Sequence, residues 1–211
     1  MRSGLTLLVV AVLSCTASAS TILLDLGSNN LMPPAGWNNM SSGVLVGQAT
    51  IADAIDSTGA STGVRIEIID SFDGVTEGGM PGVTAYDVNA AKDSFWLNNG
   101  QIGTLLFSGL DPAVPYTFTM FASRQAAGSR IATYDVAGLN SETVSLETIG
   151  NISTTVTTGN IVPNALGEVE LTVSTNGANA YLGVVEINAV PEPASLALLG
   201  LGAVTMIPRR R

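Results

Sequence analysis

The chain has no histidine, and its only cysteine, Cys15, lies close to the N-terminus. Ser-His-Asp and Cys-His nucleophiles and His-ligated zinc or iron sites are therefore excluded. Residues 20–211 contain no thiol, so no disulfide can form there and stability must come from a hydrophobic core. Glycoside hydrolysis by two carboxylates stays open on composition, but nothing marks a particular pair. We expect a protein that is not an enzyme.

Basic residues are also few, 8 lysines and arginines against 17 acidic residues. Without Arg2, Glu192 and the three C-terminal arginines, four basic and sixteen acidic residues remain, a net charge of −12. Such a charge disfavours nucleic acid and suits a soluble extracellular protein, or one that recruits divalent cations. We expect no nucleic-acid partner.

The N-terminal residues have the pattern of a secretory signal helix, residues 1–19. Arg2 supplies positive charge, residues 5–13 form an apolar run, and Ala17-Ser18-Ala19 fits an A-x-A cleavage site. A second interpretation takes Val-Leu-Ser-Cys, ending at Cys15, as a lipobox whose cysteine is lipidated. Both interpretations place the domain that follows outside the cytoplasm.

The C-terminal residues 190–211 contain Pro191-Glu192-Pro193, an apolar run from Ala194 to Ile207, and then Arg209, Arg210 and Arg211. The apolar run would make a helix of about 21 Å, which is shorter than the roughly 30 Å hydrocarbon core of a bilayer. The positive-inside rule keeps the arginines in the cytoplasm. We expect a short transmembrane helix that contacts lipid; the alternative is a buried core helix.

This order of turn, apolar segment and basic end resembles the PEP-CTERM sorting signal of exported bacterial proteins. The resemblance covers residues 190–211 only. It implies recognition by an exosortase, a membrane enzyme that cuts near the Pro-Glu-Pro triplet. The protein would be anchored in the membrane transiently and then released or transferred to the cell surface or to an exopolysaccharide matrix.

Residues 20–189 have the signals of one all-β domain. In residues 64–70, Val64, Ile66 and Ile68 alternate with polar residues, as in a half-buried strand. From Thr104 onward, similar runs recur at short intervals with turn residues between them. This spacing predicts an antiparallel β-sandwich of the jelly-roll type with about ten strands. The expected strands are 21–26, 64–70, 94–97, 104–108, 116–123, 131–137, 143–148, 153–157, 168–174 and 181–188.

Two local patterns add to this interpretation. In residues 47–56, Ile51 and Ile55 are one helical turn apart, which predicts the one short helix. Residues 109–116, Gly-Leu-Asp-Pro-Ala-Val-Pro-Tyr, resemble the L-x-P…Y corner of sandwich domains. In that corner the leucine fills the core and the tyrosine, here Tyr116, bonds back to the backbone.

A longer series of segments resembles a galactose-binding-like or carbohydrate-binding jelly roll. The resemblance spans most of residues 21–188 without a tight motif, and it implies a fold more than a ligand. Its segments are Leu23–Gly27, Ile55–Gly59, Ser94–Trp96, Gly109–Pro112, Phe118–Arg124, Ile131–Val136 and Ala180–Ile187.

Calcium is the one metal ion that the sequence allows us to expect. Asp70, Asp73 and Glu77 open a glycine-rich loop, and Ca²⁺ takes hard oxygen ligands in flexible loops. The loop lacks the D-x-D-x-D-G spacing of a calcium loop, so an exposed acidic turn is the alternative. Asp53 and Asp56 form a second acidic candidate.

For sugar binding, we expect an aromatic platform beside a few polar groups. Trp37 lies in a Pro/Gly/Asn loop and could stack on a pyranose, with Asn38 or Asn39 as hydrogen-bonding partners; anchoring the core is the alternative. For Trp96, in an expected strand, we favour a core or strand-partner role.

Arg124 and Arg130 flank residues 125–129 and are half of the basic residues of the domain. They could present a bidentate fork to a hydroxyl or carboxylate of a ligand, or form salt bridges with the many acids. The sequence therefore predicts an exported surface or matrix protein that binds carbohydrate, such as the exopolysaccharide of the cell that makes it. The alternatives are a purely structural or adhesive module and, less favoured, a carboxylate-based glycosidase.

Overall fold

β-Strands form nearly all the regular structure of residues 20–41 and 43–191, which are the residues that the computed structural model describes. Fourteen strands and one short helix are present there, so the all-β prediction is confirmed and the expected ten strands were too few. Ala19–Val190 belongs to one compact unit. The signal helix, the lipobox cysteine, the C-terminal apolar run and Arg209–Arg211 lie outside the described residues. Within the described ranges, no helix is both long and apolar enough to span a bilayer.

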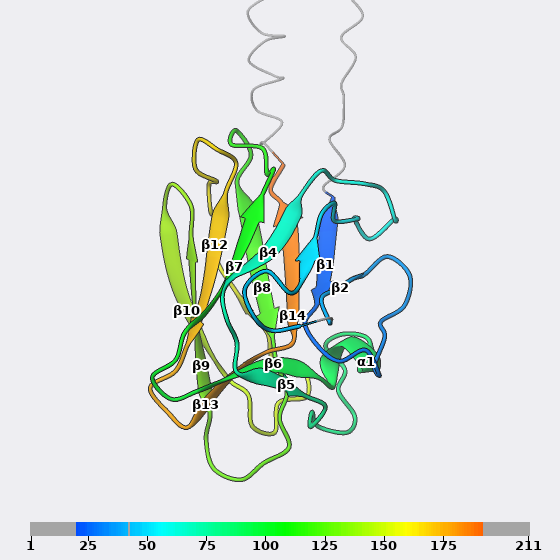
Figure 1. The fold of residues 1–211 in the computed structure, drawn as a ribbon, viewed down its shortest axis with the longest axis vertical. Helices are drawn as coiled ribbons and strands as arrows, with labels where there is room; N and C mark the ends of the chain where they lie inside the picture. Colours follow the sequence, from blue (N-terminus) through cyan, green and yellow to red (C-terminus); the bar gives the residue numbers. More distant parts are fainter. Residues whose placement is uncertain (1–19, 42, 192–211) are drawn as a thin grey trace, which may run out of the picture. The chain divides into compact units, whose positions relative to one another are not determined.

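Two large sheets form a sandwich (Figure 1). The five-stranded sheet has the order β11-β8-β14-β1-β2, and its pairs are antiparallel except β1 with β2. The six-stranded sheet has the order β10-β9-β12-β7-β4-β3 and is antiparallel throughout. The first sheet consists of β1 (Thr21–Asp25), β2 (Asn38–Asn39), β8 (Tyr116–Phe121), β11 (Val156–Thr157) and β14 (Val184–Ala189). The second consists of β3 (Thr50–Ile51), β4 (Arg65–Asp70), β7 (Gly103–Ser108), β9 (Ile131–Ala137), β10 (Ser141–Glu147) and β12 (Val169–Ser174).

The core lies between these two sheets because alternate residues of each strand point to the same face. In β4, Ile66 and Ile68 are buried, as the alternating pattern predicts. Phe107 of β7 and Phe118 of β8 meet across the interior with their ring centroids 5.5 Å apart. Burying such apolar side chains supplies the main stabilising free energy, at about 25 cal/mol per Å² of apolar surface.

The predicted corner at residues 109–116 is confirmed. Leu110 is buried in the core. The backbone N–H of Asp111 donates to the Tyr116 hydroxyl at 3.1 Å. The side chain of Tyr116 packs against the core. The corner therefore holds the start of β8 in place.

The prediction of a helix in residues 47–56 is wrong. Thr50–Ile51 is the edge strand β3, which pairs with Glu67 and Ile66 of β4. The Asp56 carboxylate accepts hydrogen bonds from the N–H groups of Thr58 and Ala60. Aspartate side chains that bond to nearby backbone in this way compete with helix formation and favour turns.

The one helix in the described residues is α1, Val88–Ala91. Asp87 caps it, because its carboxylate accepts a hydrogen bond from Asn89 N at 2.9 Å. Ala90 and Ala91 are buried in a small second cluster with Phe121 and Val184. These two residues belong to β8 and β14, so the cluster packs on the five-stranded sheet.

A third sheet, β13-β6-β5, lies at the lower end of the sandwich in Figure 1. Its strands are β13 (Asn179–Leu182), β6 (Ser94–Asn98) and β5 (Gly74–Thr76). The single strand expected at 181–188 is therefore divided at Gly183 between two sheets. A Cβ atom at Gly183 would lie 2.7 Å from the Asp93 carbonyl oxygen, so only glycine allows the backbones to approach this closely.

Candidate functional site

The third sheet has one apolar face and one face that lines a pocket. Phe95 and Leu97 of β6 are fully buried in the core. Trp96 lies between them in sequence, so the alternation of a strand turns its indole to the opposite face, where it is half-buried. In the strand register, Trp96 pairs with Tyr181 of β13 on one side and Gly74 of β5 on the other. The sheet thus places an indole and a phenol side by side.

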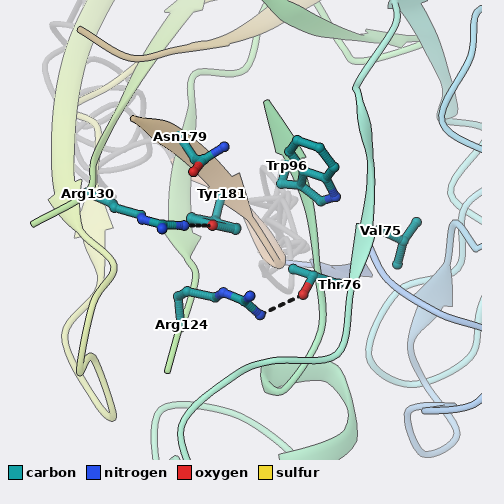
Figure 2. A pocket seen from close by; sticks show the side chains of 7 residues that line it. All are labelled: Val75, Thr76, Trp96, Arg124, Arg130, Asn179 and Tyr181. Atoms are coloured by element: carbon teal, nitrogen blue, oxygen red, sulfur yellow. Dashed lines mark hydrogen bonds between the residues drawn. The ribbon is translucent and has the colours of Figure 1, made fainter. Parts of the chain in front are cut away.

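These side chains line a pocket of about 330 Å³ (Figure 2). Gly74 leaves one edge of the indole uncovered, since a Cβ atom there would lie 2.8 Å from Trp96 Nε1. The Asn179 amide lies two residues before Tyr181 on β13. The lining residues are Val75, Thr76, Trp96, Arg124, Arg130, Asn179 and Tyr181.

Both arginines are fixed through their backbones by one buried residue, Thr148. The Thr148 carbonyl accepts a hydrogen bond from Arg124 N at 2.9 Å. The Thr148 N–H and hydroxyl donate to the Arg130 carbonyl at 3.1 and 2.9 Å. The two ends of the exposed segment 125–129 are therefore held at the same point, and the two side chains reach the pocket together.

The guanidinium groups of both arginines surround Tyr181. The Cζ atom of each lies 5.8 Å from the centroid of the Tyr181 ring, within the range of a cation–π interaction. Arg130 also donates to the Tyr181 hydroxyl, and Arg124 donates to the Thr76 hydroxyl at 2.7 Å. Figure 2 shows both arginines beside Tyr181, with Arg130 and Trp96 on opposite sides of it in this view.

Gly78 makes room for the Arg124 side chain. A Cβ atom at this position would lie 1.6 Å from Arg124 Nη1. The Gly78 carbonyl also accepts a hydrogen bond from Gln125 N at 2.7 Å, which joins the loop after β5 to the arginine segment. A side chain at residue 78 would therefore displace the guanidinium.

A carboxylate close to Arg130 bonds to the backbone instead of the guanidinium. Glu147 accepts hydrogen bonds from Arg130 N at 2.8 Å and Ile149 N at 2.9 Å, and from the Ser129 hydroxyl. Burial alone would raise the pKa of Glu147, but these hydrogen bonds outweigh it and lower the pKa below its ordinary value.

Among the described residues, neither arginine of the pocket has an acidic partner. Across residues 20–41 and 43–191, the one ion pair is Arg65–Glu67, at 2.7 Å. The salt bridges that were the alternative role of Arg124 and Arg130 are thus not found in this part of the chain. The pocket offers cationic hydrogen-bond donors beside aromatic rings and an amide.

Trp37 and Asn38 do not line this pocket. Trp37 is half-buried and packs edge-on against Tyr86, with the ring centroids 5.9 Å apart. Asn38 is buried in β2, where its amide donates to the Leu23 and Ile55 carbonyls and accepts from Ile55 N. The contacts of Asn38 link β1 to the segment after β3. The structure thus places these two candidates apart from Arg124 and Arg130.

The acidic candidates for calcium are not assembled into one site. Asp70, Asp73 and Glu77 are exposed, and Asp73 accepts a hydrogen bond from Asn98 N at 2.6 Å. Hydrogen bonds from Ser28 and Asn30 lower the pKa of Glu77. Among the residues with a described position, no three acidic, histidine or cysteine side chains are grouped so that they could hold a metal ion.

The second acidic candidate, Asp53 and Asp56, forms turns. Asp53 accepts hydrogen bonds from the Ser61 hydroxyl at 2.6 Å and from Gly63 N at 2.9 Å. Asp56 accepts from the Thr58 hydroxyl at 2.6 Å. These contacts lower the pKa of both carboxyls.

Two other carboxyl groups are buried, those of Asp25 and Asp93. Both Asp25 oxygens and Asp93 Oδ1 are buried and have no hydrogen-bond partner among the residues that the structure describes, and Asp93 Oδ2 accepts from Ser28 N. Burial raises the pKa of Asp25 to about 9, and repulsion from Asp93 and Asp87 adds to the shift. Burial also raises the pKa of Asp93, to about 6.

Five residues of the pocket were not among the expected site residues, namely Val75, Thr76, Trp96, Asn179 and Tyr181. The sequence did contain a signal for Trp96, because it alternates with Phe95 and Leu97 and must face away from them. Tyr181 carried no such signal, since the break at Gly183 that separates it from β14 depends on a close contact with another strand.

Solved structures are similar to the chain only distantly. The ANX2 ectodomain of Arabidopsis thaliana aligns with 82% of this chain and 51% of its own, at 10% identity and a TM-score of 0.47. TmCBM61, solved with β-1,4-galactotriose, aligns with 61% of this chain and 88% of its own, at 17% identity and a TM-score of 0.33. The CBM22-1–GH10 modules of Clostridium thermocellum Xyn10B, complexed with xylohexaose, align with 82% of this chain and 25% of their own, at 14% identity and a TM-score of 0.34.

The chain spans about half the length of the ANX ectodomains that it matches. No curated protein sequence matches it.

The C-terminal residues match a protein-family model. Residues 189–211 match the PEP-CTERM protein-sorting motif, which includes the Pro191-Glu192-Pro193 triplet and the three arginines. The first residues of the motif belong to the described chain, where Val190 N donates to the Pro115 carbonyl at 2.8 Å. The motif implies processing by an exosortase. The chain thus carries the PEP-CTERM sorting motif of exported, exosortase-sorted cell-surface proteins at the end of a β-sandwich.

Proposed function

We propose that this protein acts at the cell surface or in the exopolysaccharide matrix, where its β-sandwich binds carbohydrate without catalysing a reaction. The binding site is the pocket on the third sheet. The observation that carries the proposal is the placement of Trp96 beside Tyr181, with hydrogen-bonding side chains around them.

The chemistry of the pocket suits a sugar. A half-buried indole offers an apolar surface to the C–H face of a pyranose. Asn179 and Thr76 supply an amide and a hydroxyl, and both arginines supply additional donors. The pocket is large enough for one or two sugar rings, because pockets for small ligands start at about 300 Å³.

The same lining argues for binding without hydrolysis. Glycosidases of the common type need two carboxyl groups on either side of the glycosidic bond. The seven lining residues include no aspartate or glutamate. An oligosaccharide in this pocket would therefore be held without a general acid or a nucleophile next to it.

The two tryptophans of the chain provide a direct test. In Trp37→Phe, Trp96 is the only tryptophan, so the fluorescence reports on the pocket alone; in Trp96→Phe, Trp37 reports from outside it. Neutral and acidic oligosaccharides would be titrated into both variants, with calorimetry as a second measurement. We expect sugars that bind to change the emission of wild type and Trp37→Phe and to leave that of Trp96→Phe unchanged.

The purely structural or adhesive role makes the opposite prediction. In that case no oligosaccharide at millimolar concentration gives heat or an emission change in wild type or Trp37→Phe. Binding that persists in Trp96→Ala but is lost in Trp37→Ala would place the sugar site elsewhere. Turnover of a polysaccharide that disappears on changing one carboxylate would show an enzyme instead.

A further inference from the structure

The positive charge of the pocket indicates which class of sugar it binds. This inference rests on the proposed function. Residues 20–190 contain four basic side chains. Arg65 is paired with Glu67, and Lys92 follows helix α1. The other two, Arg124 and Arg130, meet at one pocket of a domain whose net charge is −12. Two of the four positive charges of this acidic domain thus lie at the same pocket.

Both guanidinium groups retain hydrogen-bonding capacity toward the pocket. A guanidinium carries five N–H donors. In the described residues, the Arg124 side chain makes one hydrogen bond, to Thr76, and the Arg130 side chain makes one, to Tyr181. Arg124 Nε is buried and has no partner there. Such a donor gains most from an acceptor that enters the pocket, because an unsatisfied buried donor is costly.

The arrangement also brings two like charges together. Each guanidinium Cζ is 5.8 Å from the same ring centroid, so the two charges are at most twice that distance apart and both can be reached from one pocket. Glu147, the acid bonded to the backbone of Arg130, forms no ion pair with either guanidinium in the part of the chain that the structure describes. An anionic group of the ligand would neutralise both arginines. A planar carboxylate fits best, because guanidinium groups bind it through two parallel hydrogen bonds.

We propose that the pocket recognises a uronate, a sugar that carries a carboxylate, with its ring against Trp96 and its carboxylate between Arg124 and Arg130. The rest of the domain is acidic and repels densely charged chains. We therefore expect the pocket to bind a polysaccharide in which uronates are separated by neutral sugars.

The test uses the full chain and pairs of trisaccharides. Each pair consists of a trisaccharide with one glucuronate or galacturonate and the same molecule after its carboxylate has been reduced to a hydroxymethyl group. We expect calorimetry to show at least one acidic member that binds about tenfold more tightly than its reduced partner. The ratio should fall when NaCl is raised to 0.5 M, because salt screens charges.

Matched variants identify the groups responsible. Arg124→Gln and Arg130→Gln should each reduce the preference for the acidic member to about twofold or less, whereas Arg65→Gln, with the same loss of charge on β4, should keep it. Arg124→Lys keeps the positive charge but not the forked pair of donors, and it should lose part of the preference for the acidic member. This variant provides a test if a glutamine variant does not fold.

Equal affinity for acidic and reduced members would overturn the uronate inference and leave sugar binding intact. Preference that persists in both arginine variants would also overturn it. If no member of any pair binds, the uronate inference and the proposed function both fail. A sulfated trisaccharide that binds as tightly as the uronate would show that the pocket recognises negative charge of any kind. That result would contradict specific recognition of a carboxylate.

Discussion

Replacing Asp25 with asparagine should stabilise the domain at neutral and alkaline pH. Asp25 lies on β1 and is fully buried, and neither of its carboxylate oxygens has a hydrogen-bond partner in the described structure. Asp93, also buried, repels its charged form. In the folded state the carboxyl therefore keeps its proton up to a pKa of about 9, whereas the unfolded chain releases it near 3.8.

The direction of the pH dependence follows from the number of protons that each state binds. Between pH 4 and 9 the folded protein binds more protons than the unfolded chain, so the free energy of unfolding falls as pH rises. The slope is at most about 1.4 kcal/mol per pH unit for one group. Asp93, with a pKa raised to about 6, adds to the slope only at the acidic end of this window.

The expected loss of unfolding free energy is large enough to measure. From pH 5 to pH 8, Asp25 alone should remove up to roughly 4 kcal/mol of the free energy of unfolding, against the 5–15 kcal/mol that is usual for a domain. In Asp25→Asn the amide stays neutral, so this loss disappears. The two proteins should have similar stability near pH 4, and the advantage of the variant should grow with pH to several kcal/mol at pH 8.

Urea unfolding followed by tryptophan fluorescence at pH 5, 6, 7 and 8 in EDTA gives these free energies. The exposed Asp70→Asn is the control and should follow the wild-type profile. A wild-type stability that is flat or rises between pH 5 and 8 would refute the reasoning, and so would an unchanged slope in Asp25→Asn. If millimolar Ca²⁺ stabilises the wild type at pH 8 and Asp25→Asn abolishes this effect, a cation and not a proton neutralises the two acids.

Three further predictions concern the pocket, the corner and the tail. Gly78→Ala should displace the Arg124 guanidinium and weaken binding of an acidic trisaccharide by about tenfold, while the melting temperature changes little; unchanged binding in calorimetry would contradict this. Tyr116→Phe removes the hydrogen bond from Asp111 N and should cost about 1 kcal/mol in urea unfolding, with sugar binding retained; no loss of stability would mean that the corner bond is not needed. Deleting residues 191–211 should change where the protein is found in cell fractions without changing its circular dichroism or unfolding curve; a truncated protein that is secreted but misfolded would show that the tail is part of the fold.

Most of the sandwich could be predicted because its strands repeat with a period of two over five residues or more. The strand expected at 131–137 has the same bounds in the structure. The tyrosine corner was predictable because its residues contact one another within a few positions. Residues 47–56 were mistaken for a helix because the spacing of Ile51 and Ile55 fits a helical turn. The pairing that decides their conformation comes from β4, which a local pattern does not reveal.

The candidate site was harder to predict than the fold, because it is formed by contacts between residues that are far apart in the sequence. Arg124 and Arg130 could be singled out because the domain has so few basic residues, and the structure places both at one pocket. For Trp96 the prediction was a core or strand-partner role; it does pair in register with Tyr181 and Gly74, but it faces away from the core, because Phe95 and Leu97 on either side of it already fill the core face. Tyr181 reaches the pocket only because Gly183 allows the chain to leave the third sheet, and short strands such as β2 and β5 have no periodicity of their own.

Strand β14 connects the pocket strand to the sorting motif, and this has a mechanical consequence. Tyr181 is followed by Gly183, then by β14, and then by Pro191 of the motif. β14 lies inside the five-stranded sheet, paired with β1 on one side and β8 on the other. Tension between a polysaccharide in the pocket and a C-terminus held at the cell surface would therefore run along β14. It would load the hydrogen bonds on both sides in shear, so that many must break together before the strand is pulled out.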